Sequence, residues 1–75
     1  MSYRVRIFLR EATQYEGSYI GEQILPFAPK PLAEILFSHQ GRQQRAVIER
    51  IAPQDWVPSS ESIPALHVVA VAATA

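Results

Sequence analysis

The stretch 32–51, with the sequence LAEILFSHQGRQQRAVIERI, decides the fold, because its short apolar runs fit either strands or helices. As strands, the runs form a hairpin closed by a turn at residues 39–42, in which Gly41 can take a positive φ. As helices, Pro31 begins the first helix and Gly41 ends it, and each helix has only about 8 to 10 residues. No Ser, Thr, Asp or Asn stands at either N-cap position. The sequence therefore favours the hairpin, and a helical pair at 32–51 stays the alternative.

The segments on either side of this stretch have strand patterns. Residues 3–10 alternate with a period of two, which places four apolar side chains on one face of a strand: Tyr3, Val5, Ile7 and Leu9. A long loop follows, strand character resumes at 19–25, and three prolines then interrupt 26–31. After a second proline-rich loop at 53–64, residues 65–72 are apolar on both faces apart from His67. The sequence predicts one mainly β domain over residues 1–75, a five-stranded roll or barrel, with an α+β fold carrying the helical pair as the alternative.

Four segments of the chain resemble the small SH3-like barrels found in short bacterial proteins of unknown function. These segments are Leu25-Pro26-Phe27-Ala28-Pro29, Glu34-Ile35-Leu36-Phe37, Val47-Ile48-Glu49-Arg50-Ile51 and Leu66-His67-Val68-Val69. The resemblance implies an SH3-like roll. The chain departs from peptide-binding SH3 domains in the long loop after the first strand, since their acidic and aromatic motif has no equivalent between Glu11 and Gly21. The resemblance therefore implies no particular ligand.

Composition limits the class of protein. The chain has 75 residues, 48% of them apolar, with seven basic and seven acidic side chains and no cysteine. A chain of this kind folds, but its core is thin and it has no disulfides or thiolate sites, which favours a reducing cytoplasm. The most apolar stretch, about 13 residues at 63–75, is shorter than the roughly 20 residues of a spanning helix, so we expect no membrane contact. Zero net charge favours self-association, and we expect a homo-oligomer whose subunit contact uses residues 65–71 and Phe8.

Aromatic side chains in two loops suggest a binding site for another protein. Tyr15 and Tyr19 follow the first strand, and Trp56 lies between Pro53 and Pro58 in the second proline-rich loop. If the loops meet at one end of the barrel, these rings form a groove for an extended or proline-rich peptide. The competing interpretation is that Trp56 closes the open end of the core. The candidate partner-binding residues are Phe8, Tyr15, Tyr19 and Trp56.

Two arrangements of arginine suggest nucleic acid instead. Arg4, Arg6 and Arg10 share a strand face with Phe8, a pattern that suits single-stranded nucleic acid because cations meet phosphates while a ring stacks on a base. In the helical alternative, 32–51 becomes a helix-turn-helix whose second helix presents Arg42 and Arg45 to base edges. The balanced net charge argues against both.

Catalytic and metal-binding motifs are missing from the sequence. His39 and His67 are the only histidines, their spacing fits no metal-ligand motif, and no phosphate loop or nucleophile motif is present. We therefore expect no cofactor, no metal and no enzymatic activity. The function predicted from the sequence is a small protein-interaction or assembly module that binds itself or another protein, and the alternative is a small DNA-binding regulator with a helix-turn-helix at 32–51.

Overall fold

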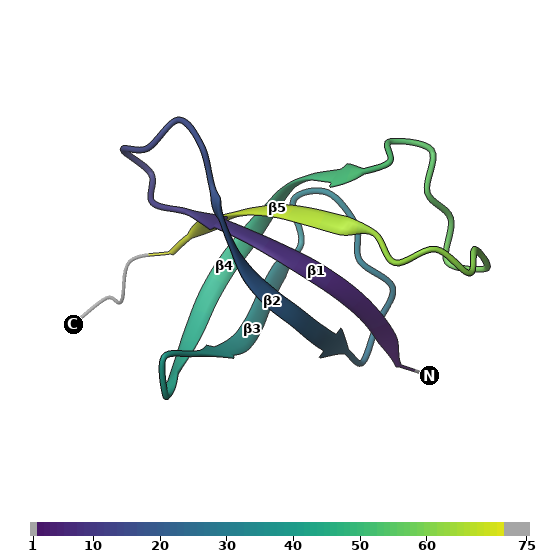
Figure 1. The fold of residues 1–75 in the computed structure, drawn as a ribbon, viewed down its shortest axis with the longest axis horizontal. Coiled ribbons are helices and arrows are strands. Elements are labelled where there is room, and N and C mark those ends of the chain that lie inside the picture. Colours follow the sequence, from purple (N-terminus) through teal and green to yellow (C-terminus); the bar gives the residue numbers. More distant parts are fainter. Residues whose placement is uncertain (1, 72–75) are drawn as a thin grey trace.

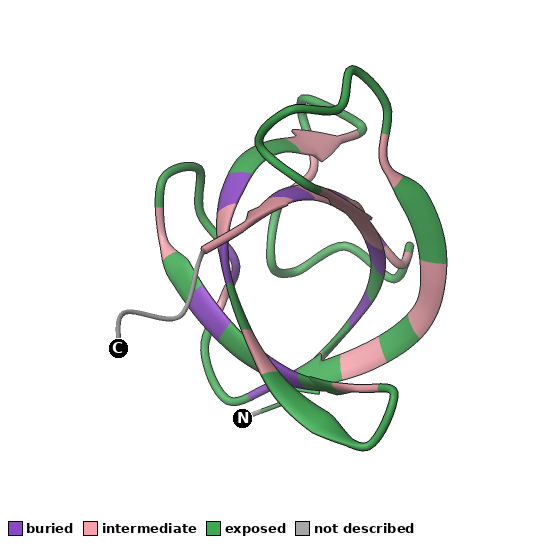
Figure 2. Cartoon of the chain, turned by 90° about the vertical axis from the view of Figure 1, so that its left-hand side faces the viewer, coloured by how far each residue is buried: buried purple, intermediate pink, exposed green. Residues whose placement is uncertain are grey.

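A computed structural model describes residues 2–71, which form a single five-stranded sheet (Figure 1). The strands are β1 (Tyr3–Arg10), β2 (Ser18–Leu25), β3 (Glu34–His39), β4 (Arg42–Ala52) and β5 (Ala65–Ala70). Their order is β2-β1-β5-β4-β3, and all neighbours are antiparallel except β1 and β5, which run parallel. Figure 2 shows that the sheet curls round on itself. The predicted mainly β fold, a small five-stranded roll, is confirmed.

The stretch 32–51 forms the β3–β4 hairpin. Every second residue of β3 points inward, so Ile35 and Phe37 are buried while their neighbours are exposed. The turn places Gln40 at φ 52° and Gly41 at φ 76°, the two successive positive values that match the right-handed twist of a tight hairpin. The helical alternative is wrong, because the stretch forms two paired antiparallel strands in which buried and exposed residues alternate with a period of two. The helix-turn-helix at 32–51 is wrong for the same reason.

The positive φ of Gln40 in the hairpin turn can be tested by mutation. Gln40 is not glycine yet has a positive φ, and Asn-Gly is the preferred pair for such a turn. We expect Gln40→Asn to stabilise the protein by about 0.5 to 1 kcal/mol in urea unfolding, since asparagine tolerates this backbone conformation better. Gln43→Asn, the same change in the extended part of β4, is the matched control and should be neutral or destabilising. Equal effects at both positions would contradict the turn.

The core lies inside the roll and takes side chains from all five strands. Its buried members are Val5, Ile7, Leu25, Ile35, Phe37, Ala46, Ile48, Leu66 and Val68. The predicted apolar face of β1 is confirmed, since Val5 and Ile7 are fully buried and Leu9 packs against the core. In β5, Leu66 and Val68 point into the core and the other face is half-buried. β5 ends at Ala70, before the predicted end, and position 72 lies outside the described residues.

Two bulges bend the sheet. In β2 the register slips at the position opposite Ile7 and Phe8, next to Gly21, whose φ of 112° suits glycine. In β4 the register slips between Ile48 and Arg50, so Glu49 is the extra residue. Strict alternation from the buried Ile48 would turn Arg50 inward; the bulge leaves both Glu49 and Arg50 exposed. The sequence therefore places two adjacent charged side chains on the outer surface of β4.

The roll stays open between its edge strands, β2 and β3, which are not neighbours in the sheet. The side chain of Gln23 bridges them, since its Nε2 donates a hydrogen bond to the backbone oxygen of Ser38 at 3.1 Å. Each edge strand carries an exposed apolar residue, Ile24 at 63% and Leu36 at 52% of full exposure. We call this opening between β2 and β3 the open seam; its exposed apolar residues are Ile24 and Leu36.

Candidate functional site

Arg10, the last residue of β1, fixes the loop at residues 11–17. Its Nε donates a 2.8 Å hydrogen bond to Oε2 of Glu49, and its Nη2 contacts Oε1 of the same carboxylate. Its Nη1 donates to backbone oxygens of the loop, at 2.8 Å to Gln14 and 3.2 Å to Glu11. The planar guanidinium therefore joins β1, the β4 bulge and the loop through one side chain. Arg10 is therefore engaged by Glu49 and the loop, so a phosphate would have to compete with these contacts.

A pocket of about 730 Å³ lies under this loop, and we call it the loop-side pocket. The loop residues 12–17 form one wall, and side chains of β1, β4 and β5 form the rest: Phe8, Arg10, Glu49, Arg50 and His67. The ring of His67 stacks on Phe8 with a centroid distance of 5.1 Å and an interplanar angle of 17°. Arg50 is paired with His67 in the β4–β5 register. The pocket thus has an aromatic side and a charged side.

Phe8 stands between two other rings on the outer surface of the sheet. Tyr19 lies 5.2 Å from Phe8 by ring centroids, and His67 stacks at 5.1 Å. Because β1 lies between β2 and β5, these two rings approach Phe8 from opposite sides. A stacking platform for single-stranded nucleic acid needs exposed ring faces. His67 covers one side of Phe8, while Phe8 also lines a pocket with Arg4, Arg6 and Tyr19, so nucleic-acid binding stays an alternative prediction.

A second pocket of about 380 Å³ lies on the other side of Arg50, and we call it the tryptophan-side pocket. Its walls are the segment 28–31, the end of β4, and Trp56 with Pro58. The indole Nε1 of Trp56 donates to the backbone oxygen of Ser62 at 3.1 Å, so the only hydrogen-bond donor of the ring is satisfied within its own loop. The indole surface that lines the pocket is therefore apolar.

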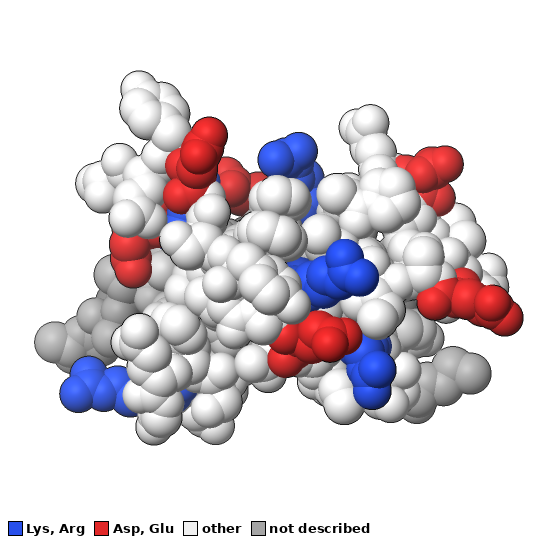
Figure 3. Space-filling view, viewed as in Figure 1, with Lys and Arg blue, Asp and Glu red and all other residues white. Residues whose placement is uncertain are grey.

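The two pockets join at the β4 bulge, because Glu49 and Arg50 line both. We call the combined surface the bulge groove; it runs from the loop at 11–17 past Arg50 to Trp56. Figure 3 shows the upper outline of the molecule dipping between two lobes, with a basic side chain in the dip. The lobes are the loops at 11–17 and 53–64, which Figure 1 places at opposite ends of the molecule. A groove of this size and mixed character is typical of binding sites.

The predicted aromatic cluster is wrong in its arrangement. Tyr15 is fully exposed on the loop after β1, whereas Trp56 lies at the other end of the roll, so the two do not meet. The reason is the parallel pairing of β1 and β5: Ala65 at the start of β5 lies beside Arg6, and the end of β5 lies beside Arg10, where the loop at 11–17 begins. Tyr19 lies on the outer surface of β2 against Phe8, outside the bulge groove.

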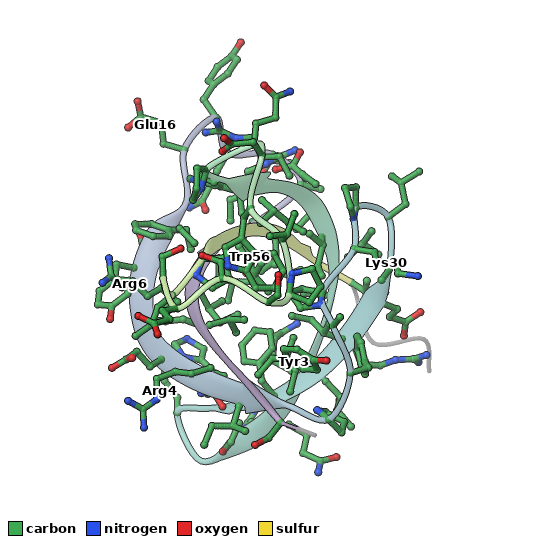
Figure 4. All side chains as sticks on the ribbon, turned by 90° about the vertical axis from the view of Figure 1, so that its right-hand side faces the viewer. Tyr3, Arg4, Arg6, Glu16, Lys30 and Trp56 are labelled. Carbon is green, nitrogen blue, oxygen red and sulfur yellow. The ribbon has the colours of Figure 1, made fainter. Side chains whose placement is uncertain are left out.

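Trp56 covers one end of the roll, as Figure 4 shows in the view onto that end, where it lies between Lys30 on one side and Arg6 on the other. It is half-buried, so it covers the opening and also presents surface to the groove. The two interpretations of this residue, an end cap and part of a binding groove, are therefore compatible.

The remaining predicted nucleic-acid-binding arginines form two groups: Arg4 and Arg6 line a pocket with Phe8 and Tyr19, and Arg42 and Arg45 lie on the β3–β4 hairpin. Arg4 lies 3.9 Å from Glu22, and Arg45 donates a 2.6 Å hydrogen bond to Glu34. Arg6 is exposed on β1, and Arg42 is exposed at the start of β4, beside the hairpin turn. The arginines of the hairpin lie on a strand and carry no recognition helix.

The charges in the groove respond to pH through two groups. The hydrogen bond from Arg10 lowers the pKa of Glu49, which favours the ionised carboxylate. Partial burial, together with the nearby charge of Arg50, lowers the pKa of His67, so its imidazole is neutral at neutral pH. At neutral pH the bulge groove therefore holds a paired Arg10 and Glu49, a neutral His67 and the charge of Arg50.

We expect His67 to make the fold less stable in acid. A histidine whose pKa is lower in the folded protein binds its proton more readily in the unfolded protein. The stability that this histidine contributes is therefore complete above its ordinary pKa of about 6.5. It declines as the pH falls from there toward the pKa of the folded protein. Urea unfolding of the wild type between pH 7.5 and 5 should show this decline. The variant His67→Phe, which keeps a ring against Phe8, should lose most of that slope. An unchanged slope in the variant would show that His67 is not the source.

Sequence reasoning missed Lys30, Glu49 and Arg50 as site residues. One signal was present for the bulge: Ile48 and Ile51 are three residues apart, and a strand can turn both inward only if an extra residue interrupts the alternation. No local signal brings the segment 28–31 against the end of β4, because that contact depends on the path of the chain between β2 and β3.

Comparisons with known proteins give no information about the ligand or activity of this chain. The chain matches no protein-family model, no curated protein and no solved structure. Within residues 2–71, no three His, Cys, Asp or Glu side chains are placed to hold a metal ion. The same residues contain no helix long and apolar enough to cross a membrane.

Proposed function

We propose that the protein is a non-enzymatic interaction module that binds an extended segment of another protein in the bulge groove. The observation that carries this proposal is the continuity of the two pockets across Glu49 and Arg50. An extended peptide needs a long, shallow site with pockets for separate side chains, and the two pockets meet that need.

The rigidity of the groove also supports this function. Arg10 donates two hydrogen bonds to backbone oxygens of the loop at 11–17 and two to the carboxylate of Glu49, which fixes the loop to β4. Prolines at 29, 31 and 58 restrict the backbone around Trp56. A site that is ordered before binding loses less conformational entropy when the partner docks. Three of the predicted partner-binding residues, Phe8, Tyr15 and Trp56, line the groove.

Selection from a displayed library of random short peptides tests this function. We expect the protein to enrich a family of peptides whose affinity falls about tenfold in Gln54→Trp, which fills the tryptophan-side pocket. Gln43→Trp, at an exposed position of β4 outside the groove, is the control and should bind as the wild type does. Failure to enrich any peptide, or equal binding by Gln54→Trp, would rule out a peptide-binding groove.

Self-association through β5 and Phe8 stays a separate prediction. The outer surface of β5 around His67 borders the loop-side pocket, so a second copy docked there would compete with a peptide. Sedimentation at micromolar concentration tests it: a dimer that dissociates when the selected peptide is added supports a shared surface, and a monomer at all concentrations contradicts the subunit contact.

A further inference from the structure

Two cations at the groove have no carboxylate partner. The three ion pairs formed within residues 2–71 are Arg4 with Glu22, Arg10 with Glu49 and Arg45 with Glu34. Lys30 and Arg50, which both line the tryptophan-side pocket, take part in none of them. The carboxylate next to Arg50 in the sequence, Glu49, is already held by Arg10 through two hydrogen bonds. The positive charges of Lys30 and Arg50 are therefore left for a ligand.

The same pocket has an apolar wall beside these charges. Trp56 and the prolines at 29, 31 and 58 line it, and the indole N–H is used by Ser62. Figure 4 shows Trp56 near the centre of this end of the roll and Lys30 toward its right-hand edge. A ligand that fits this pocket needs an apolar group against the indole and negative charge within reach of Lys30 and Arg50.

The charge pattern of the rest of the groove agrees with such a ligand. In the loop-side pocket the charges of Arg10 and Glu49 cancel, His67 is neutral, and Glu16 is the acidic residue of the loop wall. A basic ligand could pair with Glu16, but Arg10 and Arg50 line the same pocket and would repel it. An acidic ligand avoids Glu16 by placing its carboxylates at the bulge.

We infer that the partner segment is acidic and carries a large apolar side chain: carboxylates pair with Arg50 and Lys30 while the apolar side chain packs on Trp56. This inference rests on the proposed peptide-binding function and specifies the chemistry of the ligand. Arginine suits the position of Arg50 between the two pockets, because its planar guanidinium donates two parallel hydrogen bonds to a carboxylate.

The library of random short peptides displayed on phage is the probe for this inference. Enriched peptides should contain more Asp and Glu than the starting library and at least one aromatic or large aliphatic residue. Fluorescence polarisation with a labelled synthetic copy of an enriched peptide should show affinity losses of about tenfold each for Arg50→Glu and Lys30→Glu. The affinity should also fall with added salt, since the charges lie near the surface.

Matched variants distinguish a specific site from a general charge effect. Arg42→Glu makes the same charge change beside the hairpin turn, outside both pockets, and should bind as the wild type does. Trp56→Phe keeps a ring at the end of the roll and should weaken binding with little loss of stability. Equal losses in Arg42→Glu and Arg50→Glu would overturn the inference, because they would indicate attraction by net charge alone.

The outcomes separate this inference from the proposed function. If no peptide is enriched, the proposed function fails. If peptides bind and are blocked by Gln54→Trp but are neutral or basic, only the inference fails. Binding of a single-stranded oligothymidine that is lost in Arg50→Glu, in place of peptide binding, would overturn both and identify the free cations as contacts for phosphates.

Discussion

Ile48→Ala should remove a large part of the stability of this protein, about 2 to 5 kcal/mol, because a fully buried isoleucine is replaced by a smaller side chain that leaves a cavity. Ile48 lies opposite Val68 at the β4 bulge, and its backbone also holds the start of β3. Its N–H donates to the oxygen of Ala33 at 2.9 Å, and its oxygen accepts from the N–H of Leu32 at 2.7 Å. A domain of 75 residues has about 4 to 11 kcal/mol in total, so the variant should be partly unfolded at 37 °C.

Urea unfolding followed by circular dichroism measures this effect. Val47→Ala is the matched control, since Val47 is the preceding residue on the half-buried outer surface and should lose much less. Ile48→Val should fall between the two, at about 0.5 to 1.5 kcal/mol. If Ile48→Ala and Val47→Ala have the same midpoint, the inward position of Ile48 at the bulge is wrong.

Arg10→Lys should disorder the loop at 11–17 and abolish binding of the selected peptides. Lysine keeps the charge but cannot contact Glu49 in a bidentate geometry while also reaching the backbone oxygens of Glu11 and Gln14. NMR relaxation should show backbone order parameters of the loop falling from about 0.8 to below about 0.6. The loop-side pocket would then lose its wall.

Arg45→Lys is the control for this prediction, because Arg45 also pairs with a glutamate, Glu34, but has no contact with the loop. It should leave the order of the loop and the affinity for peptide unchanged. A loop that stays equally ordered in Arg10→Lys would mean that the hydrogen bonds within the loop, such as Gln14 N–H to the oxygen of Glu11 at 3.0 Å, are enough to hold it.

The strands could be predicted from the sequence because their patterns are local. The alternation in β1, the glycine at position 41 and the prolines between β2 and β3 each act within a few residues, and each restricts the backbone directly. The absence of helix caps correctly favoured the hairpin over a helical pair. The resemblance to SH3-like barrels stays a prediction, since nothing in the comparisons tests it.

The site could not be predicted because its residues meet only through the topology of the sheet. Arg10 and Glu49 are 39 positions apart, and the parallel pairing of β1 with β5 and the bulge in β4 bring them together. Local sequence patterns also could not predict that the loops carrying Tyr15 and Trp56 lie at opposite ends of the roll, because their positions depend on the direction of β5 relative to β1. Arg50 has no carboxylate partner because the neighbouring Glu49 binds Arg10, and this contact could not be predicted from the sequence.

The most direct test of peptide binding in the bulge groove is an NMR titration of the labelled protein with an enriched acidic peptide. Amide shifts should change at Ala28 and Lys30, at 49–51, at 54–57 and along the loop at 11–17. The side-chain N–H signals of Trp56 and Arg50 should titrate with the same dissociation constant. Shift changes confined to the open seam around Ile24 and Leu36, with the groove unaffected, would contradict the account and place the binding surface on the edge strands.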